Sequence, residues 1–372
     1  MHQVKNMSSG NRRLVGLDGI RGLAAICVAV HHTEGFVGFD AAPAAYLAVD
    51  LFFCLSGFVI GHAYERKLIQ ESSLSANDFA LKRLIRLYPL YLLGLVLGVL
   101  AYAGMSLSRN QQIDPVLFAA SLTASMFFLP AIGGTSLKAP NLFPFNGPSW
   151  SLFLEIVINL AYGYAARLLS SGVLILILIA SWIWLAAQTL SHGSADLIPL
   201  DGALLSGFPR VLFSFTIGIL MYRYRQRLSP GSGFGKAIAL ATIVIATASL
   251  IFQTPAAFIG IKDLIVISVL FPVAVLVLYA SNFDGILRQP LLIAGEASYA
   301  LYAIHVPLIG LMLGAWKAAG MGQPPAWAIF AIVLPLIVLL AIVVTRLYDE
   351  PVRKAISGKN TIGLRWLKWR RS

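Results

Sequence analysis

The sequence contains little charge and little cysteine. Only 12% of its 372 residues are charged and 58% are hydrophobic, and the mean hydropathy is +0.79. So few charges cannot cover the surface of an ordinary soluble protein, and that class is excluded. Both cysteines, Cys27 and Cys54, lie inside apolar runs. A disulfide framework is therefore not expected, and we interpret them as small packing residues.

Other features are also lacking. We find no cleavable signal peptide, internal repeat or low-complexity tract, and no convincing cluster of metal ligands. The basic N-terminus leads into an apolar run that continues as a multi-span pattern, unlike a cleaved leader. We expect one membrane domain at 15–350 between basic tails at 1–14 and 351–372, with no second soluble domain and no metal.

Long apolar runs are abundant. A transmembrane helix needs about 20 predominantly apolar residues. The sequence predicts an all-α, polytopic transmembrane bundle with helices at 15–36, 44–64, 86–105, 115–132, 149–168, 172–190, 207–222, 236–254, 261–280, 291–315 and 325–347.

Basic residues outnumber acidic ones, 28 to 16, giving a net charge of +12. Nucleic acid is not the expected partner, because the basic residues lie between the apolar runs, as the positive-inside rule predicts. Both ends are basic, so we expect both in the cytoplasm and an even number of crossings. The run at 115–132 is expected to be re-entrant or interfacial, which leaves about ten crossings. The connection at 65–85 is expected to be cytoplasmic and to end as an interfacial helix.

Ionisable residues inside apolar runs mark candidate functional sites, because they are costly in a bilayer. Arg21 opens the first run, and His31 and His32 lie near its end. Arg21 and His32 are about three turns apart, so they share a helix face at a spacing of roughly 16 Å. A neutral imidazole can remove a proton from a hydroxyl near pH 7. The alternative is a pair of interfacial histidines that only form hydrogen bonds.

Arg83 and Arg86 lie three residues apart, on one helix face, at the predicted cytoplasmic entrance of the third span and beside Tyr88. Two guanidinium groups on one face suit a phosphate or pyrophosphate. They fit equally well as positive-inside anchors.

Two acidic residues are further candidates. Asp50 is expected level with His32, where it would orient the imidazole, help to bind an acceptor, or only cap a helix. Glu155 needs a partner in hydrocarbon, for which Arg21 or a histidine is expected; a purely structural ion pair is the alternative.

The tenth apolar run carries Ser298, Tyr299, Tyr302 and His305, mostly on one helix face. These positions would line a cavity, or else pack as aromatics with hydrogen-bonded hydroxyls. From residues alone, two functions remain open. One is transfer of a group from a phosphorylated cytoplasmic donor to an acceptor, and the other is proton-coupled transport.

The sequence resembles the acyltransferase 3 family of integral membrane proteins over about 15–350. Beside the spacing from Arg21 to His32, the resemblance is carried by LDGIRG at 17–22, DLFFCLSGF at 50–58, RLIR at 83–86, WSLFLE at 150–155 and SYALYAIH at 298–305.

This resemblance implies transfer of an acyl group, usually acetyl, from cytoplasmic acyl-CoA to a hydroxyl of a carbohydrate or lipid-linked glycan, in polysaccharide biosynthesis at a bacterial inner membrane. A small-molecule acceptor such as a macrolide, a glycan flippase and a non-catalytic subunit of a glycan assembly machine are the alternatives. The oligomeric state is open. The site residues expected are His32, Arg21, Asp50 and Glu155 for catalysis, Arg83, Arg86 and Tyr88 for acyl-CoA, and Trp150, Tyr302 and His305 for the substrate.

Overall fold

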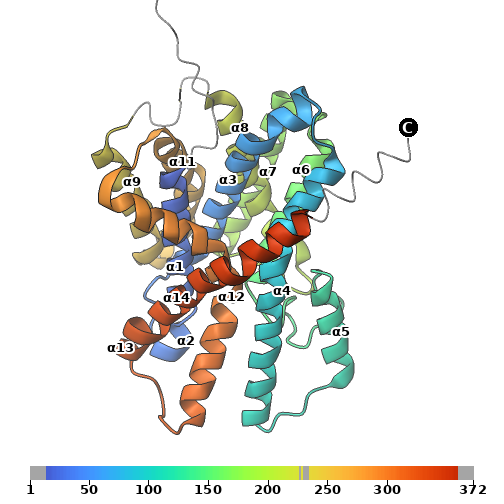
Figure 1. Ribbon diagram of the computed structural model, residues 1–372, viewed down its shortest axis with the longest axis vertical. Helices are drawn as coiled ribbons and strands as arrows, with labels where there is room; N and C mark the ends of the chain where they lie inside the picture. The colour runs from blue at the N-terminus through green and yellow to red at the C-terminus, as the bar shows by residue number, and fades with distance from the viewer. Residues whose placement is uncertain (1–13, 226–227, 229–233, 359–372) are drawn as a thin grey trace, which may run out of the picture.

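The computed structural model describes residues 14–225, 228 and 234–358, and these are helical almost throughout (Figure 1). The predicted tails at 1–14 and 351–372 lie outside the described residues, apart from Leu14 and residues 351–358. Those last eight residues continue the final helix. Within the described residues, β-pairing is limited to isolated bridges between single residues. The predicted all-α class is confirmed.

The principal helices follow the predicted apolar runs closely. They are α1 (Val15–His31), α2 (Glu34–Val37), α3 (Ala48–Ile60), α4 (Ala76–Ser108), α5 (Pro115–Met126), α6 (Ser149–Ala165), α7 (Ser171–His192), α8 (Phe208–Tyr224), α9 (Lys236–Ile251), α10 (Ile259–Ile265), α11 (Phe271–Ala280), α12 (Arg288–Ala318), α13 (Ala326–Ala328) and α14 (Leu334–Val344). Short 3-10 and π-helical segments extend several of these, so that α3 runs on to Gln70, α10 into α11, and α13 through α14.

Seven continuous helices of the described chain are long and apolar enough to cross a membrane, and the protein is an integral membrane protein. Their bounds are Ala45–Gln70, Ala76–Ser108, Ser171–His192, Leu204–Tyr224, Ala256–Ala280, Gly285–Ala318 and Ala326–Gly358. The helices α1 and α6 have 17 residues each, about 25 Å of helix at 1.5 Å per residue. Ten crossings therefore stays a prediction.

The short helix α5 has 12 residues, about 18 Å of helix, which is too little to cross a hydrocarbon core of about 30 Å. It lies beside the lower half of α4 in Figure 1. The connection at 65–85 ends in a helix as expected, and the interfacial position of that helix stays a prediction. Residues 76–108 form one continuous helix, whose start is capped by Ser75 Oγ accepting from Asp78 N.

Two close helix pairs hold the bundle together: α1 against α12, and α3 against α8. Glycine makes the second approach possible. A Cβ on Gly57 would meet the carbonyl oxygen of Phe215, and a Cβ on Gly218 would meet that of Cys54. Small residues let helix backbones approach closely inside a membrane. These contacts bring α1, α3, α4, α6 and α12 together around the candidate site.

Candidate functional site

Two cavities lie near the centre of the bundle. The first, here the arginine cavity, is lined by residues that include Arg21, Arg83, Arg86, Glu155 and Tyr302. The second, the histidine cavity, is lined by residues that include His31, His32, Tyr46, Val49, Lys138, Asn141, Trp150, Asp196 and Tyr302. Most of the predicted site residues are thus gathered from four separate helices into two neighbouring cavities, whereas Asp50, Tyr88 and His305 line neither.

Three guanidinium groups converge on the arginine cavity. Arg21 Nη2 donates to Asp18 Oδ1 at 2.9 Å and its Nε donates to Ser298 Oγ at 2.9 Å. Arg86 lies over the ring of Tyr299, 5.7 Å from its centroid. The expected common face of Arg83 and Arg86 is confirmed, since both line this cavity. Such a concentration of forked cations suits a ligand that carries phosphate groups.

Glu155 has a different partner from those expected. Its Oε1 accepts from Arg83 Nη2 at 3.1 Å and from Ser56 Oγ at 3.0 Å. Arg21 or a histidine was the wrong expectation, because Arg83 on α4 faces α6 across the cavity. Tyr88, expected to bind the donor, instead donates from its hydroxyl to the carbonyl oxygen of Met126 at 2.7 Å and lies outside the cavity lining.

The geometry of His32 fixes its tautomer. His32 Nδ1 lies 2.8 Å from the carbonyl oxygen of Val28, and His305 Nδ1 lies 2.9 Å from that of Tyr302. A carbonyl oxygen only accepts, so Nδ1 carries the hydrogen in both neutral rings. His305 Nε2 then accepts from His32 Nδ1 at 3.4 Å. The lone pair of His32 is left on Nε2, where a general base needs it.

His31 is engaged with an acid. Its Nδ1 lies 2.6 Å from Asp40 Oδ2, and Asp40 Oδ1 also accepts from the backbone of Ala42 at 2.8 Å. Both histidines line the histidine cavity, and in both it is Nδ1 that is engaged, by Asp40 in His31 and by the carbonyl oxygen of Val28 in His32. The preference for His32 over His31 as the proton acceptor rests on its spacing from Arg21 and stays a prediction.

A thin wall separates the two cavities. Tyr302 and Val49 line both of them. The Tyr302 hydroxyl lies 2.6 Å from Ser151 Oγ, and both hydroxyls can donate to the carbonyl oxygen of Pro148, at 3.5 Å from Tyr302 and 3.0 Å from Ser151. Arg21 and His32, predicted to share one helix face, come to lie in different cavities on either side of this wall.

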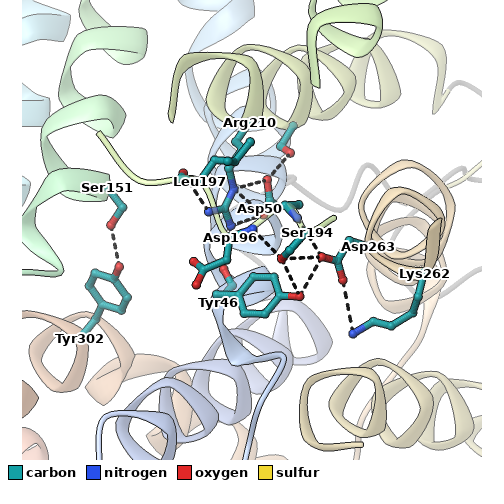
Figure 2. Close-up of polar contacts among 12 residues, drawn as sticks. Tyr46, Asp50, Ser151, Ser194, Asp196, Leu197, Arg210, Lys262, Asp263 and Tyr302 are labelled. Carbon is teal, nitrogen blue, oxygen red and sulfur yellow. Dashed lines mark hydrogen bonds and ion pairs between the residues drawn. The ribbon is translucent and has the colours of Figure 1, made fainter. Parts of the chain in front are cut away.

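Asp50 lies in neither cavity. It is fully buried, and its Oδ2 accepts from Arg210 Nη2 at 2.6 Å and from Arg210 Nε at 3.1 Å (Figure 2). The predicted contact with His32 is not among the hydrogen bonds of the described residues. Arg210 was not among the candidate residues predicted from the sequence. Its position inside the apolar run at 207–222 was the available signal.

Arg210 holds the wall of the histidine cavity. Its Nη2 donates to the carbonyl oxygen of Tyr46 at 2.7 Å and its Nη1 to that of Leu197 at 3.3 Å. Its guanidinium also lies 5.6 Å from the ring centroid of Trp150. Since Tyr46 and Trp150 both line the cavity, the Asp50–Arg210 pair acts on the site as a support.

A second buried acid supports the same wall. Asp263 is fully buried, and its Oδ2 accepts from the Tyr46 hydroxyl at 2.7 Å and from the backbone of Ala195 at 2.9 Å (Figure 2). Lys262 Nζ lies 3.4 Å from its other oxygen. The loop that follows α7 is thereby attached to α10.

The two loops at 133–148 and 191–206 are joined to one another. Asp201 accepts from the backbone N–H groups of Gly134 at 2.7 Å and Gly133 at 3.0 Å. Both glycines have positive φ, which lets their N–H groups converge. These donors, Gly134 first, lower the pKa of Asp201 below its ordinary 3.8.

Comparison with known proteins decides the family. The model of the acyltransferase 3 family, described as an acyltransferase domain, matches residues 14–346. This chain belongs to the acyltransferase 3 family. It is an acyltransferase of that family, and within the described residues no group of three or more His, Cys, Asp or Glu is placed to hold a metal ion.

Three relatives show where this acyltransferase is similar to curated proteins. It is 42% identical to "Protein 2 in picA locus" of Rhizobium radiobacter over 158 residues, which cover 40% of this chain and 81% of that protein. It is 23% identical to O-acetyltransferase OatA of Staphylococcus aureus, covering 92% of this chain but only 58% of OatA. It is 25% identical to the exopolysaccharide production protein ExoZ of Rhizobium meliloti, covering 85% of this chain and 92% of ExoZ. No solved structure matches.

Proposed function

We propose that this acyltransferase moves an acyl group, acetyl in the first instance, from acyl-CoA in the arginine cavity to a hydroxyl of a carbohydrate acceptor in the histidine cavity. One observation carries the proposal: the two cavities share the Tyr302 wall. A donor and an acceptor bound in them would meet at that wall.

The donor side follows from charge. Arg83 and Arg86 would bind the phosphates of acyl-CoA, and Arg21, further along the cavity, would favour the same anion. Glu155 keeps Arg83 oriented through their 3.1 Å contact. The pantetheine arm would then extend toward Tyr302, carrying the thioester to the wall.

The acceptor side follows from His32. Its Nε2 would take the proton of the acceptor hydroxyl as the oxygen attacks the thioester carbonyl carbon. The new C–O bond forms, the C–S bond breaks, and the CoA thiolate leaves and recovers the proton from His32 as free thiol. Trp150 and Tyr46 would contact the sugar. The names of OatA and ExoZ support acetyl transfer and a polysaccharide acceptor.

The proposed setting is a bacterial inner membrane with both termini in the cytoplasm and ten crossings. The arginine cavity would then open toward the cytoplasm, where acyl-CoA is made. Ionisable residues this deep in a bundle are also the parts of a proton-coupled transporter or flippase. Purified protein distinguishes these functions.

The test uses purified protein in detergent with acetyl-CoA and an extract of cell-envelope glycans. We expect release of free CoA to rise on addition of the extract, together with O-acetylated glycan detected by mass spectrometry. His32→Ala should lose at least about 100-fold in this rate, whereas His31→Ala, which leaves His32 Nε2 in place, should lose much less. Absence of stimulated CoA release from the wild-type protein would favour the transporter.

A further inference from the structure

One acidic side chain of the histidine cavity has no assigned role. Asp196 lies on the loop after α7, and its carboxylate is exposed to the cavity that contains His32. In Figure 2 this carboxylate points away from Arg210 and Asp263, toward the side on which Tyr302 lies. Among the described residues, no hydrogen bond or ion pair engages it.

The backbone around Asp196 is fixed on both sides. The preceding residue, Ala195, donates its N–H to Asp263 at 2.9 Å, and the following residue, Leu197, accepts at its carbonyl from Arg210 at 3.3 Å. The N–H of Asp196 donates to Ser194 Oγ at 3.0 Å. Asp263 and Arg210, which are both fully buried, therefore fix the backbone on either side of the exposed Asp196.

The other charges of the cavity already have partners. His31 is engaged by Asp40, which lies outside the cavity lining. Lys138 Nζ lies over the ring of Tyr102, 5.1 Å from its centroid. Asp196 is thus the carboxylate that a ligand in this cavity would meet, and it is close enough to His32 to interact with it electrostatically.

A carboxylate accepts hydrogen bonds only, and its two oxygens match two neighbouring hydroxyls of a sugar ring. Trp150, on the same cavity, offers an apolar surface for the C–H face of a pyranose. We propose that Asp196 binds two hydroxyls of the acceptor and so presents another hydroxyl to His32 Nε2. This inference rests on the proposed function and adds an acceptor class, an uncharged sugar with adjacent free hydroxyls.

The same carboxylate would exclude some acceptors. A uronate would bring a second negative charge into the cavity beside Asp196, and like charges at close range repel. Neutral glycosides should therefore be used in preference to their uronate counterparts.

The test compares the wild-type protein with Asp196→Asn and with Glu34→Gln. Glu34 is an exposed carboxylate shortly after α1 that does not line the histidine cavity, and it serves as the matched control. Acetyl-CoA is the donor, and the acceptor probes are methyl glycosides of neutral hexoses paired with the corresponding methyl uronides. CoA release is followed as each acceptor is varied.

We expect Asp196→Asn to raise the KM for neutral glycosides about tenfold or more, and to reduce the preference for neutral over uronate probes. The kcat, the KM for acetyl-CoA and the thermal stability should stay near wild type, and Glu34→Gln should match wild type throughout.

Several results would overturn the inference. One is a KM for neutral glycosides that is the same in Asp196→Asn as in the wild type. Another is a loss in kcat alone, which would make Asp196 a partner of His32. A third is absence of stimulation by every neutral glycoside in a protein that does release CoA with envelope glycan. Absence of CoA release with any acceptor would instead count against the proposed function.

Discussion

The pair formed by Asp50 and Arg210 allows a sharp prediction, because the sequence assigned Asp50 to catalysis and the structure gives it another task. Both side chains are fully buried, and neither lines the arginine cavity or the histidine cavity. We expect Asp50→Asn to destabilise the protein while leaving the chemistry of each folded molecule intact.

The size of the effect follows from the contacts. Asp50→Asn removes the negative charge that Arg210 meets at 2.6 Å and leaves a buried guanidinium facing a neutral amide. Breaking a buried ion pair by removing one partner costs about 3–5 kcal/mol. The Asn side-chain oxygen can still accept one hydrogen bond, and Arg210 keeps the carbonyls of Tyr46 and Leu197. We therefore expect the lower end, about 3 kcal/mol.

A double-mutant cycle measures this. Asp50→Asn, Arg210→Gln and the double variant are compared by unfolding in detergent. The double variant has no unpaired buried charge, and a neutral replacement of a buried ion pair is often tolerated. We expect it to recover roughly 2 kcal/mol relative to the sum of the single variants.

Activity decides between the two assignments. Asp50→Asn, in which Arg210 keeps its bonds to the carbonyls of Tyr46 and Leu197, should keep most of the acceptor-stimulated CoA release once corrected for its folded fraction. Additive destabilisation would show that the two residues do not form the pair described. Complete loss of activity in well-folded Asp50→Asn would restore Asp50 to a catalytic role.

Three further predictions follow from the contacts around the cavities. Arg86→Ala should raise the KM for acetyl-CoA about tenfold or more at similar kcat, and an unchanged KM would place the donor elsewhere. Tyr302→Ala should open the wall and increase acetyl-CoA hydrolysis without acceptor, whereas Tyr302→Phe, which keeps the ring, should not; equal hydrolysis would contradict the wall. Amide exchange at Gly133 and Gly134 should accelerate in Asp201→Asn near pH 7. In the wild type this protection should be constant between about pH 5 and pH 8, because a lowered pKa confines its loss to acid below 3.8.

The apolar runs predicted most of the helices, since a bilayer accepts few alternatives to a long apolar helix. The gathering of Arg83 and Arg86 was also predictable, because both lie on one helix and need only its periodicity. The partners of the acids were not. Asp50 and Arg210 are 160 residues apart, and nothing local relates them. The sequence contains several cations that could pair with Glu155, and only the packing of α6 against α4 selects Arg83.

The separation of the two cavities by Tyr302 and Val49 has a consequence for how the proposed reaction would cross the membrane. A coenzyme bound in the arginine cavity would never need to be exported, because only the two-carbon acetyl group would have to pass the Tyr302 wall. In the proposed reaction the membrane would stay closed to ions while a glycan on its far side is acylated. Such an enzyme would modify sugars beyond the membrane at no cost to the proton gradient, and would need no alternating movement of its helices.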